Sequence, residues 1–121
     1  MKVLIAAGGT GGHIYPGIAV AKEILQRDET SEVRFVGTER GLESRIVPEN
    51  GFELSLIESK GLKSVGLMGK LAGLALLPKS FLQARRLLKE FSPDVVIGAG
   101  GYVTGPVLVM ASLMSLCVKK A

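Results

Sequence analysis

The stretch Val3-Leu4-Ile5-Ala6-Ala7-Gly8-Gly9-Thr10-Gly11-Gly12-His13 decides the fold of this chain. Its first five residues are apolar and predict a buried strand, and Pro16 predicts the first turn of a helix that runs to about Arg27. A strand, a glycine turn and a helix N-terminus together form an anion-binding site. Glycine lets the backbone approach a ligand closely, and the free N–H groups of the helix point at it. We therefore expect a phosphate-bearing ligand at this loop.

A second glycine-rich loop, Gly98-Ala99-Gly100-Gly101-Tyr102-Val103-Thr104-Gly105-Pro106, repeats the arrangement near the end of the chain. It follows the apolar run Val95–Ile97 and precedes an apolar segment that predicts a helix from Gly105 to about Cys117. Ligands of open α/β sheets bind at the carboxyl ends of the strands. The two loops therefore predict one shared site.

The remaining pattern alternates between strand and helix periods, which predicts a parallel sheet with right-handed crossovers. We expect one α/β domain over residues 1–121, a Rossmann-like sheet of four parallel strands with helices on both faces. Because the predicted last helix runs into Lys119, the sheet lacks a closing strand, and we expect a truncated domain. The predicted strands are 3–7, 32–36, 52–57 and 95–97; the predicted helices are 16–27, 42–47, a glycine-interrupted region ending at 91, and 105–117.

Composition limits the chemistry. Of the 121 residues 47% are hydrophobic and 21% charged, which is typical of a folded domain. The single Cys117 excludes an internal disulfide and fits a reducing compartment. The apolar run after Lys2 is too short for a signal peptide. No Asp-x-Asp pair is present, so we predict no magnesium site and no cofactor.

Charge is unevenly distributed along the chain. The net charge is +4, and residues 60–90 alone carry seven basic side chains and one acidic one. This asymmetry predicts an anionic partner. Nucleic acid is disfavoured because Phe81 is the only aromatic residue in the basic stretch. An anionic membrane surface fits better.

The apolar stretch over residues 65–77 (VGLMGKLAGLALL) is too short to span a bilayer, which requires about 20 residues. As a helix it carries leucines along one stripe with cations beside them, a pattern typical of a segment lying in a membrane interface. The alternative is that these leucines pack on the sheet. The predicted membrane-contact residues are Leu67, Lys70, Leu71, Leu74, Lys79 and Phe81.

Several motifs in fixed order resemble the amino-terminal domain of the MurG family. They are the loop from Ala7 to His13 with Pro16-Gly17, Gly37-Thr38, Gly61-Leu62, Pro93-Asp94, and the loop from Gly98 to Pro106. The resemblance implies the acceptor-binding half of a GT-B glycosyltransferase of peptidoglycan synthesis. Such enzymes transfer N-acetylglucosamine from UDP-N-acetylglucosamine to lipid I (undecaprenyl-pyrophosphoryl-MurNAc-pentapeptide), forming lipid II. They act as peripheral proteins on the cytoplasmic face of the bacterial membrane. A carboxy-terminal donor domain completes them, so we expect the chain alone to be inactive.

The resemblance also assigns residues. It implies that His13 is the general base, that Thr10, Gly11 and Gly12 touch the donor, and that the second loop helps to hold the acceptor pyrophosphate. The second-loop residues concerned are Gly100, Gly101, Tyr102 and Thr104. Structural alternatives remain for three of these residues: His13 as a helix cap, Tyr102 packed on a helix, and Thr104 as an N-cap.

The implied reaction is an inverting transfer in which an acceptor hydroxyl attacks the anomeric carbon while UDP leaves. Imidazole is suited to take the hydroxyl proton at cytoplasmic pH. A non-catalytic, membrane-anchoring, lipid-diphosphate-binding subunit of a split glycosyltransferase remains an alternative. A dinucleotide-binding oxidoreductase is disfavoured, because GGTGGH is not G-x-G-x-x-G and the second strand ends in Gly37-Thr38 without an acidic ribose partner at its tip. Glu39 follows closely, which keeps this alternative open.

Overall fold

The computed structural model describes residues 1–9, 11–39, 41–57, 81–101, 104–114 and 117–120. Five of the six predicted membrane-contact residues therefore lie outside the described residues, as do Thr10 and Tyr102. Phe81, the sixth, is half-buried at the start of a helix over residues 81–91.

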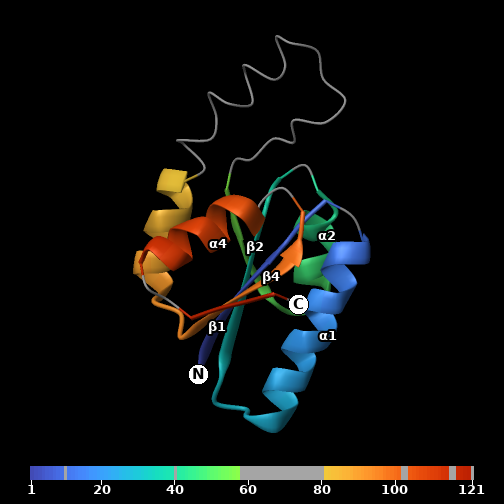
Figure 1. Cartoon of the computed structure of the whole chain (residues 1–121). Coiled ribbons are helices and arrows are strands. Elements are labelled where there is room, and N and C mark those ends of the chain that lie inside the picture. The colour runs from blue at the N-terminus through green and yellow to red at the C-terminus, as the bar shows by residue number, and fades with distance from the viewer. Residues whose placement is uncertain (10, 40, 58–80, 102–103, 115–116, 121) are drawn as a thin grey trace, which may run out of the picture.

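The described part of the chain forms a five-stranded parallel sheet in the order β3-β2-β1-β4-β5 (Figure 1). The helices α1 and α2 alternate with the first three strands, and α4 connects β4 to β5. The elements are β1 (Lys2–Ala7), α1 (Gly11–Arg27), β2 (Glu32–Gly37), α2 (Glu43–Glu49), β3 (Glu53–Leu56), β4 (Val95–Gly100), α4 (Thr104–Leu113) and β5 (Cys117–Lys120).

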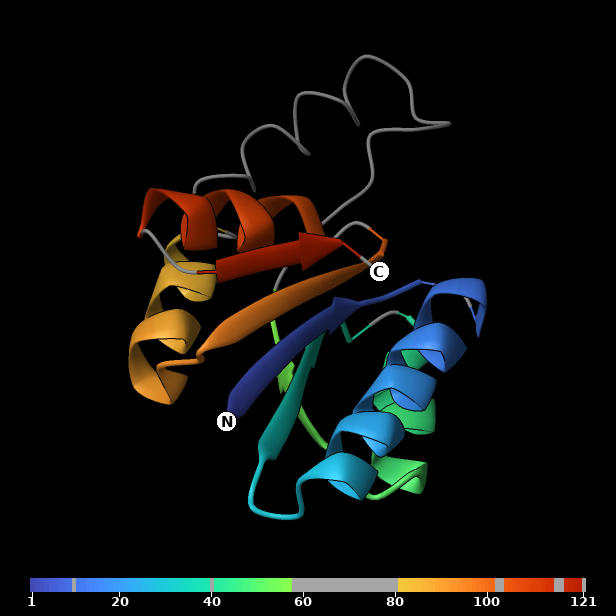
Figure 2. The same cartoon turned by 60° about the horizontal axis from the view of Figure 1, so that its bottom comes forward.

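Alternation along β1 explains why helices cover both faces of the sheet. Val3, Ile5 and Ala7 pack with side chains of α1 and α2 in one buried cluster. Leu4 and Ala6 point the other way and pack with the helix over residues 81–91 and with α4. Figure 2 shows these two helix layers with the sheet between them. The predicted Rossmann-like fold is confirmed.

The order of the strands fixes where a ligand can bind. The chain proceeds from β1 outward through β2 to β3, then returns to the other side of β1 for β4 and β5. The order in which strands are added to the sheet therefore reverses between β1 and β4, and this position is the topological switch point of the sheet. The two glycine loops follow these two strands, so the topology brings both loops together at the carboxyl ends of β1 and β4.

The prediction of a last helix that runs to Cys117, with no strand after it, was wrong. Helix α4 ends at Leu113, and Cys117–Lys120 forms a fifth strand that pairs in parallel with β4, Val95 opposite Cys117. The segment from Val107 to Val118 contains no proline or glycine, and periodicity cannot separate a buried helix from a short strand. The unpaired backbone edge of β4 decides the matter, because its N–H and C=O groups require partners.

Helix α1 also differs from the prediction, since it begins at Gly11 and contains Pro16 in its interior. Proline lacks the N–H that would bond to the carbonyl of the residue four positions earlier, here Gly12. Pro48 likewise lies inside α2, which ends at Glu49, and does not stop the helix at Val47 as predicted. The consequence for the site is that His13 lies in the first turn of a helix, so the helix backbone fixes its direction.

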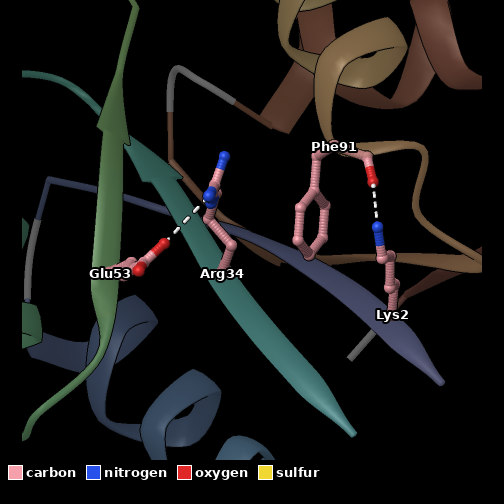
Figure 3. Close-up of polar contacts among 4 residues, drawn as sticks. All are labelled: Lys2, Arg34, Glu53 and Phe91. Carbon is pink, nitrogen blue, oxygen red and sulfur yellow. Dashed lines mark hydrogen bonds and ion pairs between the residues drawn. The ribbon is translucent and has the colours of Figure 1, made fainter.

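Phe91 anchors the helix over residues 81–91 to the amino ends of the central strands. The residue is 5% exposed, and the Arg34 guanidinium lies 4.8 Å and the Lys2 ammonium 5.6 Å from the centroid of its ring. Lys2 Nζ donates to the Phe91 carbonyl at 3.4 Å, and Arg34 pairs with Glu53 at 2.9 Å (Figure 3). The two cations therefore pack on the aromatic ring while their charges are paired or solvated.

We predict that Phe91→Ala lowers the free energy of unfolding by about 3–5 kcal/mol, because it leaves a cavity and removes both cation–π contacts. Urea denaturation of the chain measures the change. Leu82→Ala on the same helix is the control, since Leu82 is 65% exposed and its truncation leaves no cavity. Equal losses of unfolding free energy for the two variants would contradict the role of Phe91 as a buried anchor.

Candidate active site

The two glycine loops contact each other through their backbones. The Gly8 N–H donates to the Gly100 carbonyl at 3.2 Å. Gly101 has φ +97°, and a Cβ placed there would lie 2.8 Å from the Gly8 carbonyl carbon. A bulge in β4 makes this approach possible, because Ala6 pairs with Gly98 but Ala7 pairs with Gly100. The loops therefore form one interlocked unit.

His13 lies at the junction of the loops and is half-buried. Its Nδ1 is 3.2 Å from the Gly8 carbonyl oxygen. Since a carbonyl oxygen can only accept, Nδ1 carries the proton in this contact, and the lone pair of the neutral ring is on Nε2. The ring packs against Gly100, where an added Cβ would lie 2.6 Å from Cδ2 and 3.1 Å from Nε2. This contact therefore favours the tautomer with the proton on Nδ1, which leaves Nε2 as the acceptor of the ring.

Several loop N–H groups that the sequence offered to an anion are already engaged. Gly8 donates to Gly100, Gly9 donates to Glu43 Oε2 at 2.8 Å, and the Gly100 N–H donates to Thr104 Oγ1 at 3.2 Å. The first N–H groups of a helix have no intrahelical acceptor. The N–H groups of Gly11 and Gly12, in the first turn of α1, are therefore the best placed for an anion.

Thr104, the first residue of α4, fastens the second loop to the end of β1. Its hydroxyl lies 2.8 Å from the Gly100 carbonyl and 3.2 Å from the Ala6 carbonyl, and it accepts from the Gly100 N–H. These three contacts are to backbone groups at strand ends and not to N–H groups of α4, so they do not form an N-cap. A contact between Thr104 and substrate stays a prediction.

Glu43 is a site residue that the sequence analysis missed. It is fully buried, and its carboxylate accepts from Gly9 N–H and from both the N–H and the hydroxyl of Thr38, at 2.8–2.9 Å. Gly37 and Gly41 make room for it, since a Cβ at either position would collide with its side chain. The sequence signal for Glu43 was therefore the pair Gly37 and Gly41, which flank a polar turn. From the sequence alone, these glycines predict only a loop.

Glu43, an acidic residue that follows β2, offers no free carboxylate to a ribose, because it faces inward and is bonded to the backbone of Gly9 and Thr38. Glu39, also after β2, is exposed. Within the described residues, no three histidine, cysteine or acidic side chains come together in a way that could hold a metal ion.

The parallel sheet covered by helices matches the N-terminal domains of MurG and of GT-B glycosyltransferases. The model of the glycosyltransferase family 28 N-terminal domain matches residues 3–118, and the chain belongs to this family.

Curated relatives support the resemblance to the MurG family. Proteins of Anaeromyxobacter dehalogenans (strain 2CP-C) and Myxococcus xanthus are each 53% identical over 116 residues, which is 96% of this chain and 30% of the relative. Both are named UDP-N-acetylglucosamine--N-acetylmuramyl-(pentapeptide) pyrophosphoryl-undecaprenol N-acetylglucosamine transferase. The crystal structure of Acinetobacter baumannii MurG superposes with a TM-score of 0.83 at 34% identity, over 98% of this chain and 34% of that one. The chain thus spans about a third of the length of these proteins.

We predict that Gly101→Ala destabilises the chain by on the order of 1–3 kcal/mol, because alanine is strained at φ +97° and its Cβ meets the Gly8 backbone. Urea denaturation measures the effect. Gly105→Ala is the matched control: nothing lies within 4 Å of its Cβ position, and alanine favours the helix by up to about 1 kcal/mol. A Gly101→Ala variant as stable as the control would show that the loops do not depend on this contact.

Proposed function

We propose that this chain supplies the acceptor-binding, base-bearing half of an inverting N-acetylglucosaminyltransferase. The substrates are UDP-N-acetylglucosamine and lipid I, and the product is lipid II. The observation that carries the proposal is the placement of His13 between the two glycine loops, with Nδ1–H bonded to Gly8 and the Nε2 lone pair unused by that bond.

In the proposed reaction, His13 accepts the proton and the Gly8 carbonyl supports the charged ring. A hydroxyl oxygen of the acceptor sugar attacks the anomeric carbon, and its proton passes to His13 Nε2. The bond between that carbon and the UDP oxygen breaks, and its electron pair leaves with UDP. The Gly8 carbonyl stabilises the imidazolium that forms, because it accepts from Nδ1–H in both protonation states.

The positions of Gly11 and Gly12 support a donor contact. They form the first turn of α1, where free N–H groups and the helix dipole favour a negative group. We assign Thr10, Gly11 and Gly12 to the donor, and Gly100, Gly101, Tyr102 and Thr104 to the acceptor pyrophosphate. A second domain, of the kind that the longer relatives have room for, would bind most of the UDP.

The test is a transferase in which residues 1–118 of this chain replace the matching segment of the Myxococcus xanthus relative. We predict that His13→Ala lowers its kcat by about 10²–10⁴-fold, because no group remains to take the hydroxyl proton. Transfer of labelled N-acetylglucosamine to lipid I measures the rate. Gln26→Ala, an exposed position near the end of α1, is the control. A His13→Ala rate equal to the control would exclude His13 as the base.

We further propose that the chain attaches peripherally to the cytoplasmic face of an anionic membrane. Arg85, Arg86 and Lys89 are exposed on the helix over residues 81–91, together with Leu82. This helix lies on the sheet face opposite α1 and continues the basic stretch that the sequence places at residues 60–90. Among the described helices, none is long and apolar enough to cross a membrane.

We predict that Arg85→Glu/Arg86→Glu weakens binding of the chain to phosphatidylglycerol vesicles by at least about tenfold, since each basic residue near an anionic surface contributes about 1 kcal/mol. Vesicle sedimentation measures binding. The control is Lys22→Glu/Arg45→Glu, which makes the same change in net charge at exposed positions of α1 and α2. Equal weakening by the control would indicate attraction by net charge alone.

A further inference from the structure

We propose that Glu43 is a positioning residue that acts on His13 through the peptide group between Gly8 and Gly9. This inference rests on the proposed function, in which His13 is the base. It assigns a role to a buried carboxylate on a different element, α2, whose hydrogen bonds go to Gly9 and Thr38 and not to the His13 ring.

The geometry is a chain of two hydrogen bonds on one peptide group. His13 Nδ1 lies 3.2 Å from the Gly8 oxygen, and Glu43 Oε2 lies 2.8 Å from the Gly9 nitrogen. The Gly8 carbonyl and the Gly9 N–H belong to the same planar, resonance-coupled peptide unit. The carboxylate and the imidazole therefore occupy opposite ends of a single dipole.

The hydrogen bond between Gly9 and Glu43 makes the Gly8 carbonyl a stronger hydrogen-bond acceptor. A negative charge at the N–H pulls that proton and shifts electron density toward the carbonyl oxygen, and chains of hydrogen bonds strengthen one another in this way. The Gly8 oxygen becomes a better acceptor for Nδ1–H. The neutral ring is then held with its lone pair on Nε2, and the imidazolium formed after proton transfer is stabilised.

The logic is that of the carboxylate behind the histidine in a Ser-His-Asp triad, which fixes the tautomer and stabilises the imidazolium. The difference is that a peptide group stands between the carboxylate and the ring. Gly9 makes this possible, because its φ of +91° belongs to the left-handed region that favours glycine.

The surroundings of Glu43 support a fixed, charged carboxylate. Burial of a charge is costly unless donors compensate it, and Glu43 receives three. Leu42, at the start of α2, adds a bond from its N–H to the Gly9 carbonyl at 3.4 Å. The β2–α2 loop thus holds Gly9 on both sides, which keeps the carboxylate aligned with the peptide.

The experiment is ¹⁵N NMR of the imidazole in the 121-residue chain, which contains one histidine and so gives unambiguous signals. Above the pH at which His13 titrates, we expect the Nδ1–H tautomer to predominate. Glu43→Gln keeps the length of the side chain and removes its charge. We expect this variant to lower the ratio of Nδ1–H to Nε2–H tautomer by at least about twofold.

Two control variants test whether Glu43 acts on His13 through the Gly8–Gly9 peptide group, which we call the relay, or has only a structural role. Glu49→Gln removes the same charge from an exposed position of α2, and Thr38→Val removes one bond to Glu43 while leaving the bond to Gly9. We expect both to keep the wild-type tautomer ratio. A predominant Nε2–H tautomer in the wild-type chain, or an unchanged ratio in folded Glu43→Gln, would overturn the proposal.

The wild-type chain supplies a second readout that does not depend on the variant folding. As His13 is protonated, we expect the Gly9 amide proton to move downfield because its bond to Glu43 strengthens. The Gly51 amide, which donates to Pro48 at 3.0 Å, is the reference and stays fixed. A Gly9 signal that does not respond would also overturn the relay. Neither readout requires substrate, so failure of the relay is distinguishable from failure of the proposed transferase activity.

Discussion

Backbone contact between the two glycine loops is the constraint on which the rest of the site depends. Gly8 donates to the Gly100 carbonyl, and Gly101 lies so close to Gly8 that no side chain fits between them. The contact exists because β1 and β4 are neighbours at the reversal of strand order. It brings a helix N-terminus, a histidine and a second loop together in a space that neither loop could define alone.

Two side chains from the neighbouring helices α4 and α2 hold the glycine loops in place. Thr104 ties the second loop to the ends of β1 and β4, and Glu43 ties the first loop to α2 and to Thr38. Glycine-rich loops have a large conformational entropy to lose on folding, so such bonds determine whether one geometry prevails. The polar groups that hold the loops are therefore as important to the site as those that face a ligand.

The division of labour in the proposed enzyme follows from this arrangement. The interlocked loops present an imidazole and the N–H groups of a helix N-terminus, which in the proposed reaction serve an acceptor hydroxyl and a diphosphate. The curated relatives are about three times as long as the region they share with this chain. A base fixed by backbone and buried carboxylate on one domain can remain correctly oriented while a second domain brings and releases the nucleotide.

The sequence by itself determined the α/β class, four of the five strands, the helices on both faces and the two loops, because hydrophobic period and glycine clusters are local signals. It also pointed to His13, though not to the state of its ring. Only the tertiary structure decided the fifth strand at Cys117–Lys120, which forms because β4 presents an open edge. Only the tertiary structure selected Glu43 from several acidic residues, since its role depends on Gly9, 34 positions away in the chain. Hydrogen bonds between distant backbone groups leave no periodic pattern, so they become visible only when the chain is folded.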